Sequence, residues 1–548
     1  MGRHESVTPS ARPGWLLPAA AVGVVALLGA GGFAVTQLRS QPASSAAAAV
    51  TCSTTATVQV TTSRAMVPVV QSAAEAAGRG GACATYAVTD QPEADTAAAV
   101  ASGAHPDVWV PDASVWLDEV RTKAPQAPLV AGPSVASSPL VIALPTRLAA
   151  AGTKPSWAGA VAKAFPMRTA DPTRNASARL ALFSSYAALG TSDQARIALG
   201  GAMIQLSRVA ADSDAALLQR AKDAPDAAEA FPVEESVVAA YLKANPGVGL
   251  SAALPTDGTA QFDHPFVTFS DAAPGVASAT QALQSALTSG DAPARLKEAG
   301  LRSSPADADA AVTGMPAGVP TYLPAPAAPI AAGLLRSWSS VRTEMKMLAV
   351  IDTSGSMKSP AGASTRMALA HQAGLIALSA FPFGSSIGLW QLGYRLGGMD
   401  QDWRELVPTR DLTQLVDGRD QKSILADGFT MAASMPGGGT GLYDTVLGAY
   451  QAAQAGFDPA RVNSVVVLTD GFNDDPYSIT LDQLIGQLTA LRDPNRPIVL
   501  ITVGIGPDAD QAVLKRITDS VGGQSYSAVQ PEQIIPVFVE ALLNRSRG

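Results

Sequence analysis

The chain has 548 residues, which is enough for roughly two to four domains of about 100–200 residues each. Hydrophobic residues make up 47% and charged residues 15% of it, a balance that supports folded cores and excludes a mostly disordered chain. The formal net charge is −8 and Lys and Arg form no cluster. A nucleic-acid-binding protein would present a basic face, so nucleic acid is excluded as a partner.

An uncharged apolar segment lies near the N-terminus, at residues 15–35. About 20 apolar residues suffice for a helix to cross a bilayer. Arg3 and Arg12 precede the segment, so the positive-inside tendency places residues 1–14 in the cytoplasm as a short tail. We therefore expect a transmembrane anchor at 15–37 and a single-pass cell-membrane protein whose bulk is extracytoplasmic. A cleaved signal peptide, with its cleavage site in the small-residue run that follows, is the alternative.

The chain contains two cysteines, Cys52 and Cys83. An even pair in an exported protein suggests a disulfide, whereas a cytosolic chain would keep buried thiols. Each cysteine opens a strand-like segment, TATVQVTTS after Cys52 and ATYAVT after Cys83. If the two strands are parallel neighbours, their first residues fall within the Cα separation of roughly 4.4–6.8 Å that a disulfide spans. We expect a Cys52–Cys83 disulfide.

A proline-rich segment divides the remaining chain. Residues 303–332 contain six prolines and no apolar periodicity, a composition typical of an extended spacer. We set the linker at 305–343, with one domain before it at 50–304 and a second after it at 344–548.

The first half alternates short apolar strands with Ala-rich helices, which predicts β-α-β units and a parallel sheet. Several of its segments resemble bacterial extracellular solute-binding proteins of the type 2 periplasmic fold. These segments are HPDVWVPDASVWL (105–117), SVASSPLVIALP (134–145), DPTRNASARLAL (171–182), FPVEESVVAAY (231–241) and KEAGLRSS (297–304). The resemblance implies a two-lobed α/β domain that holds a small polar or anionic solute.

Such proteins bind their solute through hydroxyls and amides at helix N-termini, where unpaired N–H groups and the helix dipole favour anions. The positions that match are Thr62, Ser63, Ser137, Ser138, Thr173, Asn175 and Ser177, the last three before a helix expected at 177–189. Serine is also a favoured helix cap. The alternative to solute binding is therefore that Ser63 and Ser177 are ordinary N-caps.

The second half carries five oxygen-bearing residues at the ends of apolar runs or in a Gly-rich loop. They are Asp352, Ser354 and Ser356 in DTSGSM, Thr440 in GGGTG, and Asp470 in VVVLTDG. Oxygen-only ligands are typical of Mg²⁺, or of Mn²⁺. The set resembles the metal-ion-dependent adhesion site (MIDAS) of the von Willebrand factor type A domain (VWFA).

That resemblance implies a doubly wound, mostly parallel, Rossmann-like sheet at 344–548 with helices on both faces. It also implies hydroxyl ligands from Ser354, Ser356 and Thr440, and charge from Asp352 and Asp470. Mg²⁺ keeps exchangeable waters, one of which a partner's carboxylate can replace. Nearby, Asp474 and Asp475 are either solvated turn acids or part of an auxiliary cation site.

No enzymatic motif fits. Residues 384–388 read G-x-S-x-G, but that motif needs a strand before the serine and a helix after it, and here a helix precedes a strand. The last histidine, His371, also precedes that serine, and the phosphate-binding and HExxH patterns are missing. We therefore expect no catalysis.

Two functions remain. The first is a membrane-anchored extracytoplasmic adhesion protein that docks a protein partner's acidic residue on Mg²⁺. The second is a receptor whose first half captures a small polar solute and signals through the second half. An accessory subunit for metal insertion, a third role of similar domains, is disfavoured by the extracytoplasmic placement.

If Cys52 and Cys83 are paired, the denatured but unreduced exported protein should react with no thiol reagent, because neither sulfur is free. Mass spectrometry after alkylation, with and without prior reduction, measures this. Labelling of both cysteines without reduction would contradict the pairing.

Overall fold

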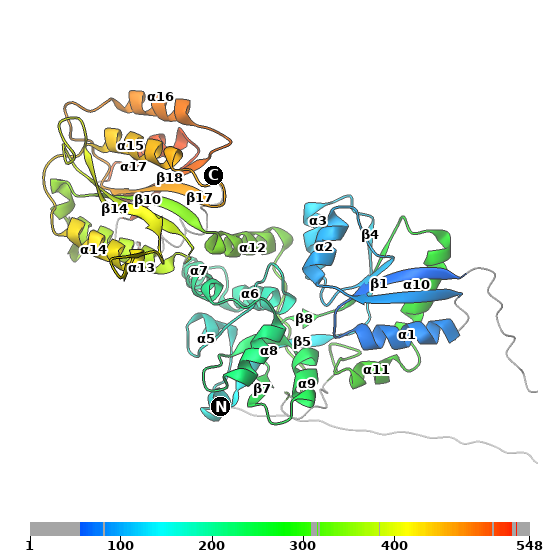
Figure 1. Ribbon diagram of the computed structural model, residues 1–548. Coiled ribbons are helices and arrows are strands. Elements are labelled where there is room, and N and C mark those ends of the chain that lie inside the picture. Colours follow the sequence, from blue (N-terminus) through cyan, green and yellow to red (C-terminus); the bar gives the residue numbers. More distant parts are fainter. Residues whose placement is uncertain are drawn as a thin grey trace, which may run out of the picture. The chain divides into compact units, whose positions relative to one another are not determined.

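The structure is a computed structural model that describes residues 55–79, 83–307, 315, 318–382, 384–506, 509–528, 533 and 537 (Figure 1). The expected cytoplasmic tail, transmembrane anchor and Cys52 lie outside the described residues. Every helix in the described part of the chain is too short or too polar to cross a membrane.

The first half contains a five-stranded sheet in the order β2-β1-β3-β9-β4. Its strands are β1 (Ala56–Thr62), β2 (Ala84–Asp90), β3 (Val108–Val110), β4 (Leu129–Ser134) and β9 (Pro265–Phe269). β1 pairs in parallel with β2 and β3, whereas β9 runs antiparallel to β3 and β4. The expected parallel arrangement of the first strands is confirmed. The N–H of Ala56 donates to the carbonyl of Cys83 at 3.1 Å, so the starts of β1 and β2 lie side by side.

Helices cover this sheet because each has one apolar face. They are α1 (Val67–Arg79), α2 (Glu93–Ala101), α3 (Val115–Lys123), α10 (Pro274–Thr288) and α11 (Ala292–Glu298). In α1, the buried residues Val69, Val70, Ala73 and Ala77 recur at helical spacing, and the first three join the same core as Val58 and Val60 of β1.

A second sheet completes the first half, in the order β6-β5-β7, with β8 also paired to β5. Its strands are β5 (Ser138–Pro145), β6 (Phe231–Glu234), β7 (Leu250–Ala253) and β8 (Gln261–Phe262), all antiparallel to β5. The helices around it are α4 (Thr146–Ala150), α5 (Trp157–Val161), α6 (Ala176–Leu189), α7 (Asp193–Arg208), α8 (Asp214–Asp223) and α9 (Glu235–Ala244).

A helix occupies the C-terminal part of the expected extended linker. α12 (Ala328–Arg342) begins inside the proline-rich segment and carries a proline in its first turn. Proline is tolerated there because the first-turn N–H groups have no helical partner. Trp338 and Val341 of α12 are buried. The linker was expected to extend to residue 343, but the structure forms a helix from Ala328. The prolines therefore indicated an extended spacer that is too long at its C-terminal end.

The second half contains a six-stranded sheet in the order β14-β13-β10-β17-β18-β19. Its strands are β10 (Met345–Asp352), β13 (Ser386–Leu392), β14 (Trp403–Asp411), β17 (Val462–Thr469), β18 (Ile498–Ile505) and β19 (Gln524–Ala528). All neighbours pair in parallel except the edge strand β14, which runs antiparallel to β13. The expected mostly parallel sheet is present, and β14 is the strand that the sequence did not indicate.

Helices lie on both faces of this sheet, as expected. They are α13 (Arg366–Ala380), α14 (Gln421–Ala433), α15 (Leu442–Ala455), α16 (Leu481–Leu491) and α17 (Gln511–Asp519). Met367 of α13 and Phe429 of α14 pack into one core, whereas Val446, Leu484 and Leu514 of the other three helices pack into a second. Apolar residues on both sides of each central strand, such as Ile351 and Val350, explain its continuous apolar sequence.

The remaining elements are short: a 3-10 turn at Gly355–Lys358, and two small hairpins. The hairpin strands are β11 (Pro360–Ala361) with β12 (Ser364–Thr365), and β15 (Leu415–Val416) with β16 (Arg419–Asp420).

Replacing Leu500 by alanine should lower the free energy of unfolding by about 2–5 kcal/mol, because its fully buried side chain on β18 leaves a cavity. Leu415→Ala is the control, because that leucine is 69% exposed and its loss should cost less than about 0.5 kcal/mol. Thermal melting of the full chain measures both. Equal effects of the two substitutions would contradict the core that we describe.

Candidate functional site

The strand order produces a crevice between β10 and β17. After β10, the chain adds β13 and β14 on one side of it and then β17, β18 and β19 on the other. In doubly wound sheets, ligands bind outside the carboxyl ends of the strands where this order reverses. Asp352 is the last residue of β10, and Asp470 directly follows β17. The fold therefore brings both predicted carboxylates to this crevice.

Asp352 is fully buried and is held by its neighbours. Its Oδ1 accepts a hydrogen bond from the Ser354 N–H at 2.8 Å, and its Oδ2 accepts one from the Thr469 hydroxyl at 2.6 Å. The hydroxyls of Ser354 and Ser356 lie 2.9 Å apart beside it. Burial, with a further contribution from the charge of Asp470, raises the pKa of Asp352 to about 6. A cation at this position would relieve that unfavourable burial.

The Gly-rich loop brings Thr440 to the same edge. Thr440 is 3% exposed, and its backbone exchanges two hydrogen bonds with that of Asp474, at 3.2 and 2.8 Å. On the other side, the carbonyl of Gly438 accepts a hydrogen bond from the Gly355 N–H at 2.9 Å. The loop therefore joins the turn that carries Ser356 to the loop that follows Asp470.

Asp470 has one oxygen engaged and one without a partner. Arg366, the first residue of α13, donates from Nη1 to Oδ2 of Asp470 at 2.8 Å, and both residues are buried. Oδ1 has no hydrogen-bond partner in the described structure. A buried carboxylate oxygen without a partner is costly, and a divalent cation would satisfy it. Together with Ser354, Ser356 and Asp352, this oxygen makes a donor set that fits Mg²⁺.

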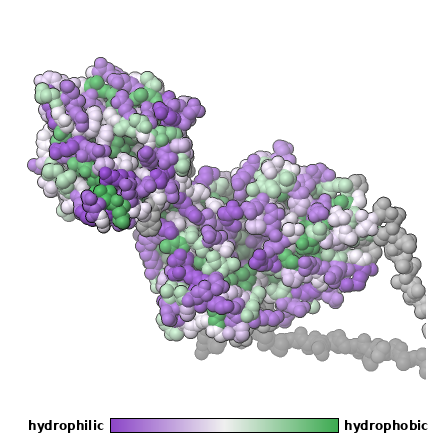
Figure 2. Space-filling model, in the orientation of Figure 1, coloured by the Kyte–Doolittle hydropathy of each residue, from purple (hydrophilic) through white to green (hydrophobic). Residues whose placement is uncertain are grey.

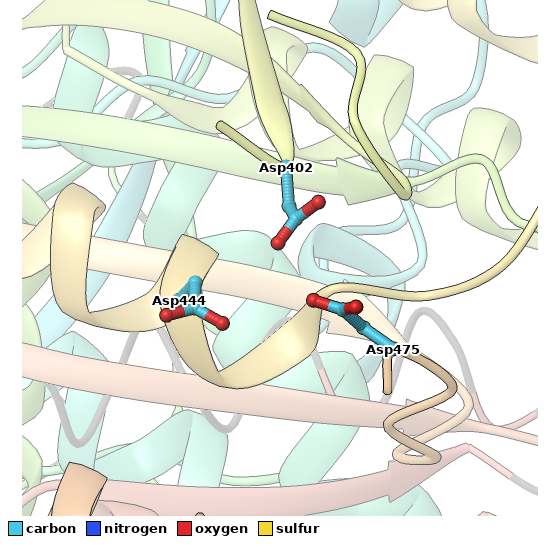
Figure 3. Close-up of side chains that lie close together, drawn as sticks. All are labelled: Asp402, Asp444 and Asp475. Carbon is cyan, nitrogen blue, oxygen red and sulfur yellow. The ribbon is translucent and has the colours of Figure 1, made fainter. Parts of the chain in front are cut away.

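A second group of acids lies at the same edge of the sheet. One oxygen each of Asp402, Asp444 and Asp475 lies within 4.8 Å of the others, and Figure 3 shows the three carboxylates directed toward one another. A Cβ atom on Gly441 would lie 2.2 Å from Cγ of Asp402, so this approach requires a glycine. Burial, followed by the charge of Asp475, raises the pKa of Asp402. Of the two acids that the sequence offered for an auxiliary cation site, Asp475 belongs to this group. Asp474 is exposed and is not part of it.

The first half contains a cavity of about 1530 Å³, lined by residues of both of its sheets. Ser63 follows β1, Asp112 follows β3, and Glu234 is the last residue of β6. Helix starts also line it, among them Glu93 at the start of α2 and Asp214 at the start of α8. We call this cavity the cleft.

Three of the predicted solute-binding residues line the cleft: Ser63, Asn175 and Ser177. The hydroxyl of Ser63 is buried and has no hydrogen-bond partner in the described structure. Asn175 caps α6 by accepting a hydrogen bond from the Ala178 N–H at 2.8 Å. The helix therefore starts at Ala176, one residue before the expected start, and Ser177 is not its cap.

The other four predicted residues are absent from the described lining of the cleft and are engaged within the protein. The Thr62 hydroxyl donates to the Val110 carbonyl (2.8 Å), Ser137 accepts from Gln261 (3.2 Å), Ser138 accepts from the Ser236 N–H (3.3 Å), and Thr173 donates to Asp171 (2.7 Å). Short-range hydrogen bonding of this kind is the usual role of Ser and Thr near strand and helix ends.

Sequence reasoning missed the acidic residues of the cleft. Burial raises the pKa of Glu93 well above its usual range, that of Asp112 to about 7, and that of Asp214 to about 6. Glu234 is 3% exposed, and its charge contributes to the raised pKa of Asp112. Each acid follows an apolar strand or begins a helix. Acids at helix starts are common as partners of the helix dipole, so the pattern alone did not mark them as functional.

Comparison with protein families places the first half of the chain beside a known family. Residues 58–302 match the model of the family described as bacterial extracellular solute-binding protein. The resemblance that the sequence indicated for the first half is confirmed.

Two curated relatives, both named uncharacterized protein, come from Mycobacterium tuberculosis strains CDC 1551 and H37Rv. Each is 26% identical over 465 residues, which cover 78% of this chain and 66% of the relative. The chain therefore spans just under two thirds of their length.

Among solved structures, the chain is similar to a von Willebrand factor type A protein from Catenulispora acidiphila, with 20% identity, 37% of this chain, 42% of that chain and a TM-score of 0.28. It is also similar to the sulfate-binding protein SubI from Mycobacterium tuberculosis H37Rv, with 15% identity, 45% of this chain, 86% of that chain and a TM-score of 0.35.

Replacing Asp214 by asparagine should make the protein more stable than the wild type at pH 8 and change little near pH 4. The folded-state pKa of about 6 lies above the ordinary value of 3.8, so the protonated acid stabilises the fold at low pH. That contribution is lost as the pH rises through about 6. Thermal melting between pH 4 and 8 tests this, with Asp193→Asn, 88% exposed, as the control. A wild type more stable than the variant at pH 8 would contradict the buried acid.

Proposed function

We propose that this chain is a membrane-anchored extracytoplasmic binding protein whose second half holds Mg²⁺, or Mn²⁺, and docks a carboxylate of a protein partner. One observation carries the proposal: Asp352 and Asp470 are fully buried at neighbouring strand ends, and Oδ1 of Asp470 has no partner among the described residues. The family match over residues 58–302 supports the extracytoplasmic placement.

Each residue of the site has a distinct role in this proposal. Ser354, Ser356 and Thr440 would hold the ion through their hydroxyls, and Asp352 and Asp470 would supply negative charge. When bound, the ion offers an exchangeable water position that a partner's carboxylate can take. The protein itself supplies two carboxylates and three neutral hydroxyls, so the ion can accept the partner's carboxylate as a third negatively charged ligand.

Arg366 is a positioning residue in this arrangement. It engages Oδ2 of Asp470 and leaves Oδ1 directed elsewhere, so it fixes which oxygen is available. It also places a buried positive charge beside Asp470. Arg366 therefore stabilises Asp470 in the metal-free protein and lowers the affinity for the ion, since the two cations share one carboxylate.

Exposed apolar side chains near the site suit a protein partner. Met399 (71% exposed) lies in the loop after β13, and Phe472 (51%) and Tyr477 (74%) lie in the loop after β17, at the same carboxyl edge as the site. On the face seen in Figure 2 the described surface is mostly hydrophilic, with hydrophobic residues in small separate patches. Aromatic residues and methionine are enriched at protein interfaces.

Solute capture by the first half is the second candidate function. The cleft of about 1530 Å³ and the family match over 58–302 favour it. In this function, a small polar ligand bound in the cleft would be signalled through the second half.

Saturating Mg²⁺ should raise the thermal stability of the full chain, by about 2.7 kcal/mol at a hundredfold excess over the dissociation constant. Asp352→Ala should abolish this stabilisation, because it removes a ligand and one of the two charges. Ser356→Ala and Thr440→Ala should weaken it less, because each removes only a neutral hydroxyl. Calorimetric titration with Mg²⁺ and Mn²⁺ gives the affinities, and pull-down with and without EDTA reports partner binding.

Asp482→Ala is the matched control, because its side chain is 84% exposed on α16 and should leave metal binding unchanged. Circular dichroism establishes that each variant is folded. A folded wild-type protein that shows neither heat nor a thermal shift at millimolar metal would rule out the metal-dependent function.

A further inference from the structure

The charge of the cleft is the opposite of what an anion-binding protein needs. Seven acidic and four basic residues line it. Two of the basic residues are exposed and paired with acids: Arg64 with Asp90 at 2.8 Å, and Arg174 with Asp95 at 2.9 Å. The other two, Lys243 and Lys297, are also exposed. The interior of the cleft is therefore acidic.

Glu93 carries an unsatisfied oxygen at the cleft. Its side chain is 7% exposed, and its Oε2 accepts a hydrogen bond from the Trp109 indole at 2.7 Å. Its Oε1 has no hydrogen-bond partner of good geometry in the described structure. The hydroxyl of Ser63, 8% exposed and also lining the cleft, lacks a partner as well. Buried polar atoms without partners mark positions that a ligand can satisfy.

The other acids of the cleft, of which Glu234 is buried and Asp112 and Asp214 are half-buried, extend the negative charge from one sheet to the other. Asp112 follows β3, Asp214 begins α8, and Glu234 ends β6. His264 lies with Nε2 at 3.3 Å from Oε1 of Glu234 and supplies one positive charge when it is protonated.

The basic residue near Asp112 is already engaged. Arg179 is paired with Glu119 at 2.7 Å and stacks on the Trp116 ring at 3.9 Å. The cluster of Glu93, Asp112, Asp214 and Glu234 therefore exceeds the positive charge around it.

The spacing of these acids does not suit a single metal ion held by three of them. In the part of the chain that the structure describes, no three acidic or histidine ligand atoms of the cleft lie within 4.8 Å of one another. A ligand with two or more cationic groups can reach the acids on the side of each sheet, and the volume of about 1530 Å³ admits one. Ammonium groups, each with three N–H donors, match separated carboxylates.

We propose that the cleft binds an extended organic polycation of the polyamine class, held by Glu93, Asp112, Asp214 and Glu234. The proposal rests on the solute-capture function and names its ligand class. Glu93 and Asp112 bind one ammonium end from the side of the first sheet, and Asp214 and Glu234 bind the other end from the side of the second.

Calorimetric titration of the full chain with spermidine, at physiological salt, tests the proposal, with inorganic sulfate and glucose as anionic and neutral probes. Spermidine should bind and the other two should not. Glu93→Gln and Asp214→Asn should each weaken spermidine binding at least about tenfold, because each removes a charge-assisted hydrogen bond. Asp193→Asn, which removes an exposed acid outside the cleft, should not.

The other possible outcomes of the titrations would overturn different parts of the proposal. Binding of sulfate or glucose without spermidine would overturn the polyamine class and leave solute capture standing. Absence of binding by all three probes would overturn both. Spermidine binding that is equally tight in both cleft variants and in Asp193→Asn would show general surface attraction, and would also overturn the proposal. Thermal melts of the variants separate loss of binding from loss of folding.

Discussion

The burial of like charges at the carboxyl ends of parallel strands is the constraint on which the second half depends. Asp352 and Asp470 are both fully buried at neighbouring strand ends, and Arg366 engages one oxygen of the pair. Charges buried this close repel strongly when water is excluded. The hydroxyls around them, the Gly-rich loop and the start of α13 are arranged to contain that repulsion, and a divalent cation would complete the arrangement.

The same constraint recurs in the first half with a different outcome. Glu93, Asp112 and Asp214 have raised pKa values because they are buried together with too little positive charge nearby. In the second half the acids converge on one point and suit a compact ion. In the cleft they are spread between two sheets, so they suit an extended cation. The positions of the acids, more than their number, therefore determine whether a site suits a metal ion or an organic polycation.

Much of the fold could be predicted from local sequence. The apolar run that ends in VVVLTDG predicted the strand that became β17, because a strand covered on both faces is apolar throughout. The edge strand β14 was missed because its sequence, WRELVPTRD, carries four charged residues and a proline and has a single fully buried residue, Val407. α12 was missed because the prolines before it indicated a spacer.

The sequence by itself determined the residue types of the metal site and the strand ends that carry them, since Asp352 and Asp470 each terminate an apolar run. It could not determine that Arg366, 104 residues from Asp470 along the chain, binds it. Nor could it determine the sign of the charge in the cleft. Glu93 and Glu234 are 141 positions apart in the sequence. Only the tertiary structure brings such residues together and removes them from water, and burial together is what turns ordinary surface residue types into a candidate binding site.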